Sequence, residues 1–181
     1  SAIKGIGIAS VEAIVKAREG GKFTSLFDFM AKVEPGAVNR RGLESLICAG
    51  AFDSLKPSDL TINKWRAQLF ASVDGALQYG QRIWNDKLNG QTGLFGGNDS
   101  SGASFQTLAD APAWSQKEIC AQEKQAIGFY LSLHPLDDYG QVLESLGIRN
   151  LADYEELRPG ENITLAGIVS ALQVKHSKKG N

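Results

Sequence analysis

The chain has 181 residues, 43% of them hydrophobic, and a formal net charge of −1 at pH 7. This length fits one or two small globular domains, and the charge argues against a protein that coats nucleic acid non-specifically. The sequence has no apolar run of about 18 residues and no signal-peptide pattern, so we expect neither a membrane span nor export. Cys48 and Cys120 form no CxxC pair, which disfavours a disulfide scaffold or a zinc site and favours a cytoplasmic protein.

The first 88 residues contain four stretches with apolar residues at helical spacing. These predicted helices cover residues 10–20, 24–33, 39–50 and 58–88. Their expected N-caps include Ser10, Ser25 and Ser58. The last helix is the longest, and we expect it to kink at Gly75 or Gly80. The residues at helical spacing, expected to form the inner faces, are Val11, Ile14, Val15 and Ala17 or Arg18 in the first stretch and, in the other three, Leu26, Phe29, Met30, Leu43, Leu46, Ile47, Trp65, Leu69, Val73, Leu77, Trp84 and Leu88.

The second half begins with a different composition. Residues 89–113 are rich in Gly, Ser, Asn and Asp, which indicates a linker. Two more helices are predicted at 115–132 and 136–147, separated by Pro135. Alternating β-branched residues predict a strand over 162–177. This strand has no partner within the chain, so we expect the sequence to be a piece cut inside a β domain.

The most specific pattern of the first half is AIKGIG, residues 2–7, directly before a helix. Gly5 and Gly7 permit a positive φ and leave no side chain between the backbone and a ligand. The helix begins near Ile8, and its first N–H groups have no intrahelical acceptors, so a phosphate oxygen fits there. Lys4 is placed to reach the same phosphate. The alternative is a plain tight turn before a helix.

A weaker copy of this pattern follows in GLESLICAGAFDSL, residues 42–55. Two such turns predict a tandem helix–hairpin–helix module, in which each hairpin holds the phosphates of one strand of a duplex. Contacts to the backbone carry no base readout, so binding should ignore sequence and weaken with salt. Arg40 and Arg41 begin the second unit and are either phosphate contacts or a solvated first turn. The predicted DNA-binding residues are Lys4, Gly5, Ile6, Gly7, Arg40, Arg41, Gly50 and Ala51.

Leu94 and Phe95 stand side by side in a stretch that is otherwise polar and rich in glycine. Exposed apolar side chains gain nothing at a loop tip, so this pair either folds back onto the long helix or buries in a pocket on a partner. Gln91 offers one acceptor and two donors that would fix the register of such a peptide.

The order of these motifs resembles the bacterial replicative DNA polymerase III alpha subunit family. The resemblance is carried by AIKGIG, VNRRGLESLICAGAFDSL, GQTGLFGG and EKQAIGFYLSLHPLDDY, and ITLAGIVSALQVKHSKKG resembles the first strand of that family's OB domain. It implies a mainly α fold. The implied domains are a tandem helix–hairpin–helix unit with the long helix at 1–88, a flexible linker at 89–113, a helical connector at 114–158 and the first strand and turn of a truncated OB domain at 159–181.

The resemblance also implies the partners. Gln91, Leu94 and Phe95 match the family's peptide for the β sliding clamp, which makes the chain a non-catalytic tether to double-stranded DNA and the clamp. The parent chain would be a DNA polymerase that reaches other replisome subunits, with Mg²⁺ at a palm outside this sequence. We expect no catalytic residue, cofactor, metal or membrane contact in the chain itself, and we expect it to be monomeric.

Two alternatives stay open. One is the same region of the error-prone polymerase paralogue, although the clamp peptide favours the replicative form. The other is a stand-alone helix–hairpin–helix scaffold for DNA repair, against which the segment EKQAIGFYLSLHPL argues.

Polar residues near the end of the chain have simpler interpretations. Asp137 and Asp138 are expected to cap a helix start, and His134 is expected to be structural. A basic tip around His176, with Lys175, Lys178 and Lys179, is either a contact for single-stranded DNA or a solvated hairpin.

Overall fold

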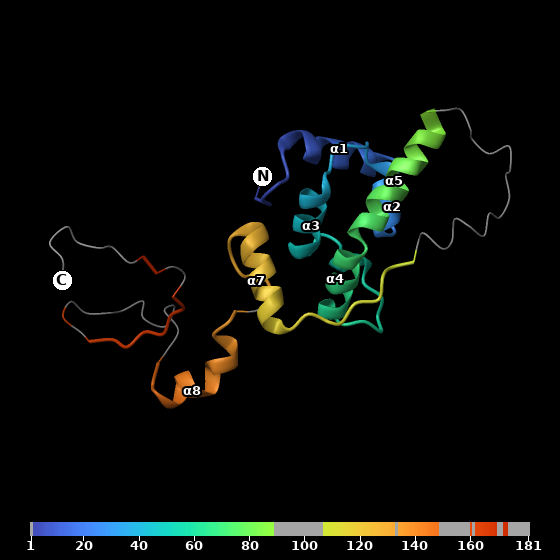
Figure 1. Ribbon diagram of the computed structural model, residues 1–181. Coiled ribbons are helices and arrows are strands. Elements are labelled where there is room, and N and C mark those ends of the chain that lie inside the picture. Colours follow the sequence, from blue (N-terminus) through green and yellow to red (C-terminus); the bar gives the residue numbers. More distant parts are fainter. Residues whose placement is uncertain are drawn as a thin grey trace, which may run out of the picture. The chain divides into compact units, whose positions relative to one another are not determined.

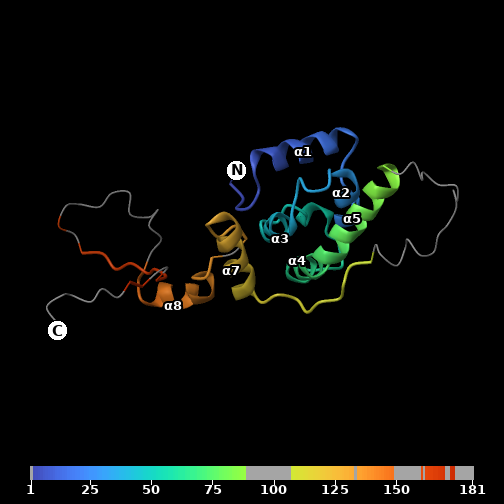
Figure 2. The same ribbon diagram turned by 45° about the horizontal axis from the view of Figure 1, so that its top comes forward.

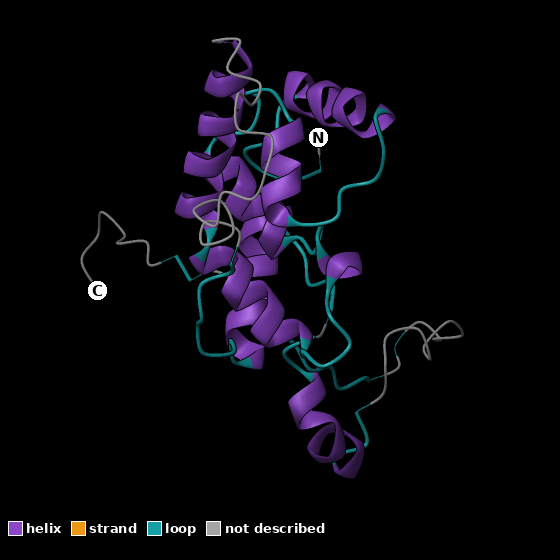
Figure 3. Ribbon diagram, turned by 90° about the vertical axis from the view of Figure 1, so that its right-hand side faces the viewer, coloured by secondary structure: helices purple, strands orange, loops and turns teal. Residues whose placement is uncertain are grey.

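The computed structural model describes residues 2–88, 107–132, 134–148, 160, 162–169 and 172–173. Within these residues the chain forms seven α-helices, two short 3₁₀ helices and no strand (Figures 1 and 3). The α-helices are α1 (Ile8–Glu19), α2 (Leu26–Lys32), α3 (Arg40–Cys48), α4 (Ile62–Ala71), α5 (Val73–Leu88), α7 (Gln116–Ile127) and α8 (Gly140–Ser145). The 3₁₀ helices are Asp53–Leu55 and Asp137–Tyr139. The chain divides into two compact units, residues 1–132 and 133–181, which are described separately.

Local capping explains where the early helices begin. The Ser25 hydroxyl accepts the Asp28 N–H at 3.0 Å, so the predicted N-cap of α2 is confirmed. The Asn39 side chain accepts the Gly42 N–H at 2.8 Å and caps α3 in the same way. The prediction for Ser10 was wrong, because α1 begins at Ile8 behind Gly7 and Ser10 lies inside the helix.

The predicted long helix is two helices, α4 and α5, which meet at Ser72. Thr61 caps α4, so the prediction of Ser58 as N-cap was wrong. The Ser72 hydroxyl donates to the Gln68 carbonyl at 2.7 Å and accepts the Ala109 N–H at 2.8 Å. The break is therefore contacted by a residue 37 positions further along the chain. Helix α5 runs through Gly75 and Gly80 without ending at either.

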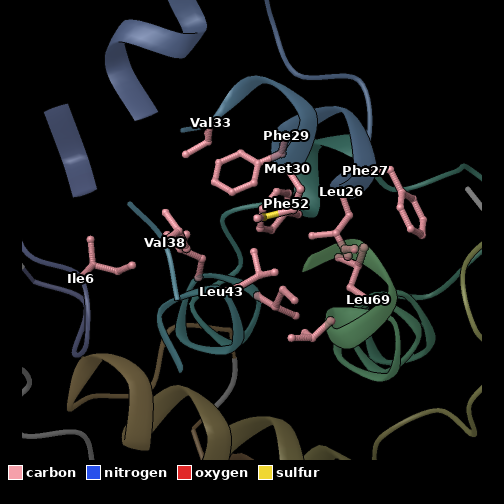
Figure 4. Packing of buried hydrophobic residues seen from close by; sticks show 14 of the residues in the cluster. Ile6, Leu26, Phe27, Phe29, Met30, Val33, Val38, Leu43, Phe52 and Leu69 are labelled. Atoms are coloured by element: carbon pink, nitrogen blue, oxygen red, sulfur yellow. The ribbon is translucent and has the colours of Figure 1, made fainter. Parts of the chain in front are cut away.

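The core of the first unit lies between α2, α3, α4 and α5 (Figure 4). Nine of the predicted core residues are buried: Leu26, Phe29, Met30, Leu43, Leu46, Ile47, Trp65, Leu69 and Val73. Leu77 and Trp84 are half-buried, and Leu88 is 79% exposed at the end of α5. Helix α1 buries none of its residues, so its expected inner face is not part of the buried core, and Val11 and Val15 are exposed. The rings of Phe29 and Phe52 meet edge to face at 5.2 Å, which ties α2 to the turn after α3.

Helix α2 crosses α5 at Gly80, which is buried. A Cβ at this position would lie 2.6 Å from the Met30 carbonyl oxygen and 3.0 Å from the Met30 Cβ. The two helices can approach this closely only because position 80 has no side chain. Gly80 is therefore explained by the crossing, and not by a kink.

Helix α7 belongs to the same unit as the hairpins. It begins at a capping box, in which Ser115 and Glu118 exchange hydrogen bonds, and it ends at Gly128 with φ of 91°. It lies beside α3, and the Lys4 N–H donates to the Ala126 carbonyl at 2.8 Å (Figures 1 and 2). The residues just before α7 lie along α4, where the Lys64 ammonium pairs with the Asp110 carboxylate at 2.6 Å.

In the second unit the Asp137 carboxylate accepts the His134 N–H at 2.7 Å, and His134 Nδ1 accepts the Leu136 N–H at 3.2 Å. The His134 ring thus stabilises the turn, as expected for a structural residue. The prediction that Asp137 and Asp138 cap a helix start was wrong, because both lie inside the 3₁₀ helix, whose N-cap Leu136 has no side-chain capping bond. Residues 162–169 and 172–173 form neither helix nor strand, and the rest of the predicted OB strand and the basic tip lie outside the described residues. The helical part of the predicted fold is confirmed, and the strand is not seen.

Candidate nucleic-acid interface

The first glycine turn is held in place by Ile6. This side chain is 6% exposed and joins the core near Val38, whereas Lys4, Gly5 and Gly7 are exposed (Figure 4). Gly5 has φ of 82°, a conformation that favours glycine. Gly7 has φ of −83° and ψ of 171°, so only the first of the two glycines uses a positive φ.

The amino end of α1 is open. Gly7 is the N-cap and makes no side-chain capping bond, and the first turn of the helix contains no acidic residue. A Cβ at position 7 would meet nothing within 4 Å. The first N–H groups of α1 and the positive end of its dipole are therefore available to an anion.

The first turn packs on Gly42, which lies inside α3. The sequence pattern did not predict this contact. A Cβ at position 42 would lie 2.9 Å from the Ile6 Cδ1 and 3.3 Å from the Gly5 carbonyl oxygen. The turn therefore packs directly on the α3 backbone. A glycine inside a helical pattern was the available signal, since such a residue often has a packing reason.

The structure brings together three of the predicted basic residues. Lys4, Arg40 and Arg41 line one cleft of about 530 Å³ between the first turn, α3 and α7. Arg40 pairs with Glu44 at 2.9 Å and with Asp74 at 2.5 Å, and these hydrogen bonds raise its pKa. In the described part of the chain, no hydrogen bond or ion pair engages the side chains of Lys4 and Arg41. Two cations of the cleft are thus ready to meet an anion.

The second glycine turn has a different environment. The Gly50 and Ala51 N–H groups donate to the carbonyls of Ile47 and Leu46, which closes the end of α3, with Gly50 at φ of 77°. A Cβ on Gly50 would lie 2.6 Å from the Arg66 guanidinium and 2.8 Å from the Asp53 carboxylate. Neither Gly50 nor Ala51 lines the basic cleft. The glycine here has a packing reason of its own, and its predicted contact with DNA stays a prediction.

Arg66 lies at the centre of a buried ion network that the sequence analysis also missed. Its residue exposure is 1%, and its guanidinium binds Asp53 at 2.6 Å and Glu123 at 2.8 Å. Glu123 is fully buried and also accepts the N–H groups of Leu131 and Ser132 at 2.8 and 3.0 Å. Glu123 shares the apolar face of α7 with Ile119 and Ala126. A carboxylate at a position where the helical spacing expects an apolar residue indicates a buried charged partner, and this was the signal in the sequence.

The environment of Glu123 controls its charge. Burial by itself raises the pKa of this carboxyl group, but hydrogen bonds from Ser132 and Arg66 outweigh burial and leave the pKa lowered. Glu123 is therefore ionised at neutral pH and balances the buried guanidinium.

The predicted clamp-binding residues Gln91, Leu94 and Phe95 lie outside the described residues, so their role stays a prediction. Among the residues that the structure places, no group of three or more His, Cys, Asp and Glu side chains could hold a metal ion. No helix within that same set is long and apolar enough to cross a membrane.

The turn, the helix that follows it and their packing on α3 agree with a known structural motif. Residues 1–61 match the family described as the helix-hairpin-helix motif. This match covers both glycine turns and ends just before α4.

Curated relatives extend the similarity to the whole chain. It is 41% identical to the DNA polymerase III subunit alpha of Neisseria meningitidis serogroup A, 38% identical to that of Haemophilus influenzae and 36% identical to that of Escherichia coli. Each match covers 99% of this chain and 15% of the relative. The chain is therefore homologous to part of DNA polymerase III alpha subunits, and it spans about 15% of the length of these relatives.

Proposed function

We propose that this chain is the region of a replicative DNA polymerase III alpha subunit that binds duplex DNA and tethers the enzyme to its sliding clamp. The observation that supports DNA binding best is the open amino end of α1 beside Lys4 and Arg41. Two unpaired cations and a helix N-terminus in one exposed place suit a phosphate. The similarity to polymerase subunits over 99% of the chain favours this function over a stand-alone repair scaffold.

The proposed contact is with the sugar–phosphate backbone of one strand. Backbone N–H groups and lysine or arginine side chains meet phosphates in any sequence, so the affinity should not depend on base composition. It should fall steeply between low and physiological salt, because each neutralised phosphate releases counterions. Arg40, Gly50 and Ala51 remain proposed members of this interface beside Lys4, Gly5, Ile6, Gly7 and Arg41.

Gly7→Ala is expected to weaken duplex binding without destabilising the fold. The backbone of Gly7 has a conformation that alanine adopts, and the new methyl group meets no atom within 4 Å. The folding free energy should therefore change little, because the loss of a glycine N-cap, which costs up to about 1 kcal/mol, is offset by about 0.4–1 kcal/mol from the reduced entropy of the unfolded chain. The methyl group would stand between the helix end and a phosphate. Fluorescence anisotropy with a labelled duplex, together with a thermal melt, measures the two effects.

Gly5→Ala is the matched comparison, because Gly5 has a positive φ and alanine is strained there, at a cost of roughly 1 kcal/mol. Gly5→Ala should lower the melting midpoint and the duplex affinity together. If Gly7→Ala binds the duplex as tightly as the wild type, the first turn does not hold DNA.

For the clamp, the proposal rests on the Gln91, Leu94 and Phe95 pattern and on the family. Leu94 and Phe95 would enter an apolar pocket on the clamp, each contributing roughly 1.5–3 kcal/mol before ordering costs.

A peptide spanning residues 88–98 is expected to bind a purified bacterial β clamp weakly, and replacing both Leu94 and Phe95 by alanine should abolish the binding. Calorimetry measures both peptides. A peptide with the residues of 88–98 in scrambled order is the control for composition. Equal binding by the wild-type and the doubly substituted peptide would show that this is not the clamp motif.

Template-directed DNA synthesis is proposed for the parent protein. A polymerase needs acidic residues that hold Mg²⁺, and no described cluster in this chain fits that requirement. No catalytic step is therefore assigned to these residues.

A further inference from the structure

The basic cleft has a second wall that belongs to α7. Besides Lys4, Arg40 and Arg41, its lining includes Gln122, Gln125 and the end of α7 at Ala126. Glu44, Ser45 and Cys48 of α3 and Phe70 of α4 complete the lining. In Figures 1 and 2 the N-terminal turn lies next to the carboxyl end of α7, with α3 alongside.

Specific contacts join the two walls. The Lys4 N–H donates to the Ala126 carbonyl at 2.8 Å, which fixes the first turn to the end of α7. The Cys48 thiol of α3 also donates to the Gln122 side-chain carbonyl of α7 at 3.6 Å. Burial raises the pKa of Cys48 to about 12, so the thiol keeps its proton and remains a donor. The carbonyl end of the Gln122 amide is thereby occupied, and its NH₂ end is left for a ligand.

The chemistry of the lining selects an anion. Arg40 is already paired with Glu44 and Asp74, so the net positive charge of the cleft comes from Lys4 and Arg41. The α7 wall adds side-chain amide groups and no charged side chain. In the described part of the chain, no hydrogen bond engages the Gln125 amide. Cations on one side and amide donors on the other suit a chain of phosphates and sugars, whose oxygens accept from both.

We propose that α7 forms the second wall of the DNA site, with Gln122 and Gln125 donating to the sugar–phosphate backbone of the strand held by the first turn. This rests on the proposed function of that turn and adds residues to it. The DNA site would then include residues from before and from after the predicted clamp peptide in the sequence. Residues 91–95 would fall between two parts of one DNA-binding unit, and would not follow that unit.

Gln125→Glu tests the proposal. A carboxylate facing phosphates should weaken binding of a short labelled duplex by roughly tenfold, and Gln125→Ala should weaken it by roughly twofold to fivefold through the lost donor. The matched control is Gln116→Glu, the same change on the same helix at a position that does not line the cleft. It should bind nearly as the wild type does. Gln125 is exposed, and Gln116 lies in the first turn of α7, where a carboxylate is favourable, so thermal melts should show all three variants folded.

The outcomes separate this proposal from the one it rests on. If both Gln125 variants bind the duplex as tightly as the wild type while Lys4→Ala binds more weakly, α7 is not part of the site, although the first turn is. If Gln116→Glu weakens binding as much as Gln125→Glu, the effect is one of overall charge, and the proposal fails. If Lys4→Ala and Arg41→Ala also bind as the wild type does, the proposed function of the turn itself is wrong. Saturation of the cleft by inorganic phosphate alone, without loss of duplex binding, would show an anion site unrelated to DNA.

Discussion

Glu123→Ala is expected to destabilise the first unit by about 3–5 kcal/mol, because it removes one partner of a buried ion pair. The substitution leaves Arg66 with a single carboxylate partner, Asp53, in surroundings where Arg66 is 1% exposed. It also leaves the N–H groups of Leu131 and Ser132 without their acceptor. Domains are commonly stable by only about 5–15 kcal/mol, so this is a large share of the total. Urea unfolding followed by circular dichroism measures the change.

The control is Asp110→Asn, which breaks the exposed pair between Lys64 and Asp110. An ion pair in solvent contributes little, so the unfolding midpoint should stay nearly the same. If Glu123→Ala shifted the midpoint no more than Asp110→Asn, the buried network would not be holding α7 in the unit.

The network also predicts a pH dependence with a definite sign. The pKa of Glu123 in the folded chain is lower than its ordinary value of 4.5, so the folded state binds this proton less readily than the unfolded state. The stability that Glu123 contributes is fully present above about pH 4.5 and is lost as the pH falls through the folded pKa. Glu123→Gln should lack this part of the acid sensitivity. Comparing the unfolding free energies of the wild type and Glu123→Gln across the acid range separates the contribution of Glu123 from that of the other carboxylates.

Gly80→Ala is expected to destabilise the unit by about 1–3 kcal/mol through overpacking. The added Cβ would lie 2.6 Å from the Met30 carbonyl oxygen and 3.1 Å from the Met30 carbonyl carbon. Because the obstacle is backbone, no side-chain rotation relieves it, and α2 and α5 must move apart. That movement opens the core around Leu26 and Phe29, which are 1% and 3% exposed. Thermal and urea unfolding both report the loss.

Gly75→Ala is the matched control on the same helix. A Cβ at position 75 meets nothing within 4 Å, and alanine favours a helix over glycine by up to about 1 kcal/mol. The two substitutions should therefore have opposite signs. If Gly80→Ala were as stable as Gly75→Ala, the close crossing of α2 and α5 would not explain the glycine.

The sequence by itself determined the features that depend on atoms a few residues apart. Ser25 predicted the start of α2, because its hydroxyl bonds to an N–H three residues later. Apolar spacing identified Leu43 and Ile47 as the inner face of α3, and both are fully buried. The first turn could also be predicted, since a helix start and its glycines are adjacent in the chain. The order of motifs was enough to recognise the family, with which the chain shares 36–41% identity in the relatives compared.

Only the tertiary structure decided features that depend on a distant segment. The break at Ser72 is hydrogen-bonded by Ala109, and the need for glycine at positions 42 and 80 comes from Ile6 and Met30. A glycine in a helical pattern looks the same in sequence whether it kinks the helix or admits a neighbour, so Gly80 was assigned to the wrong cause. The charge of Arg66 is balanced by Glu123, 57 residues away, and the cleft beside Lys4 is completed by α7. Burial and close approach depend on which distant segments pack together, and the spacing of residues along one helix carries no information about that packing.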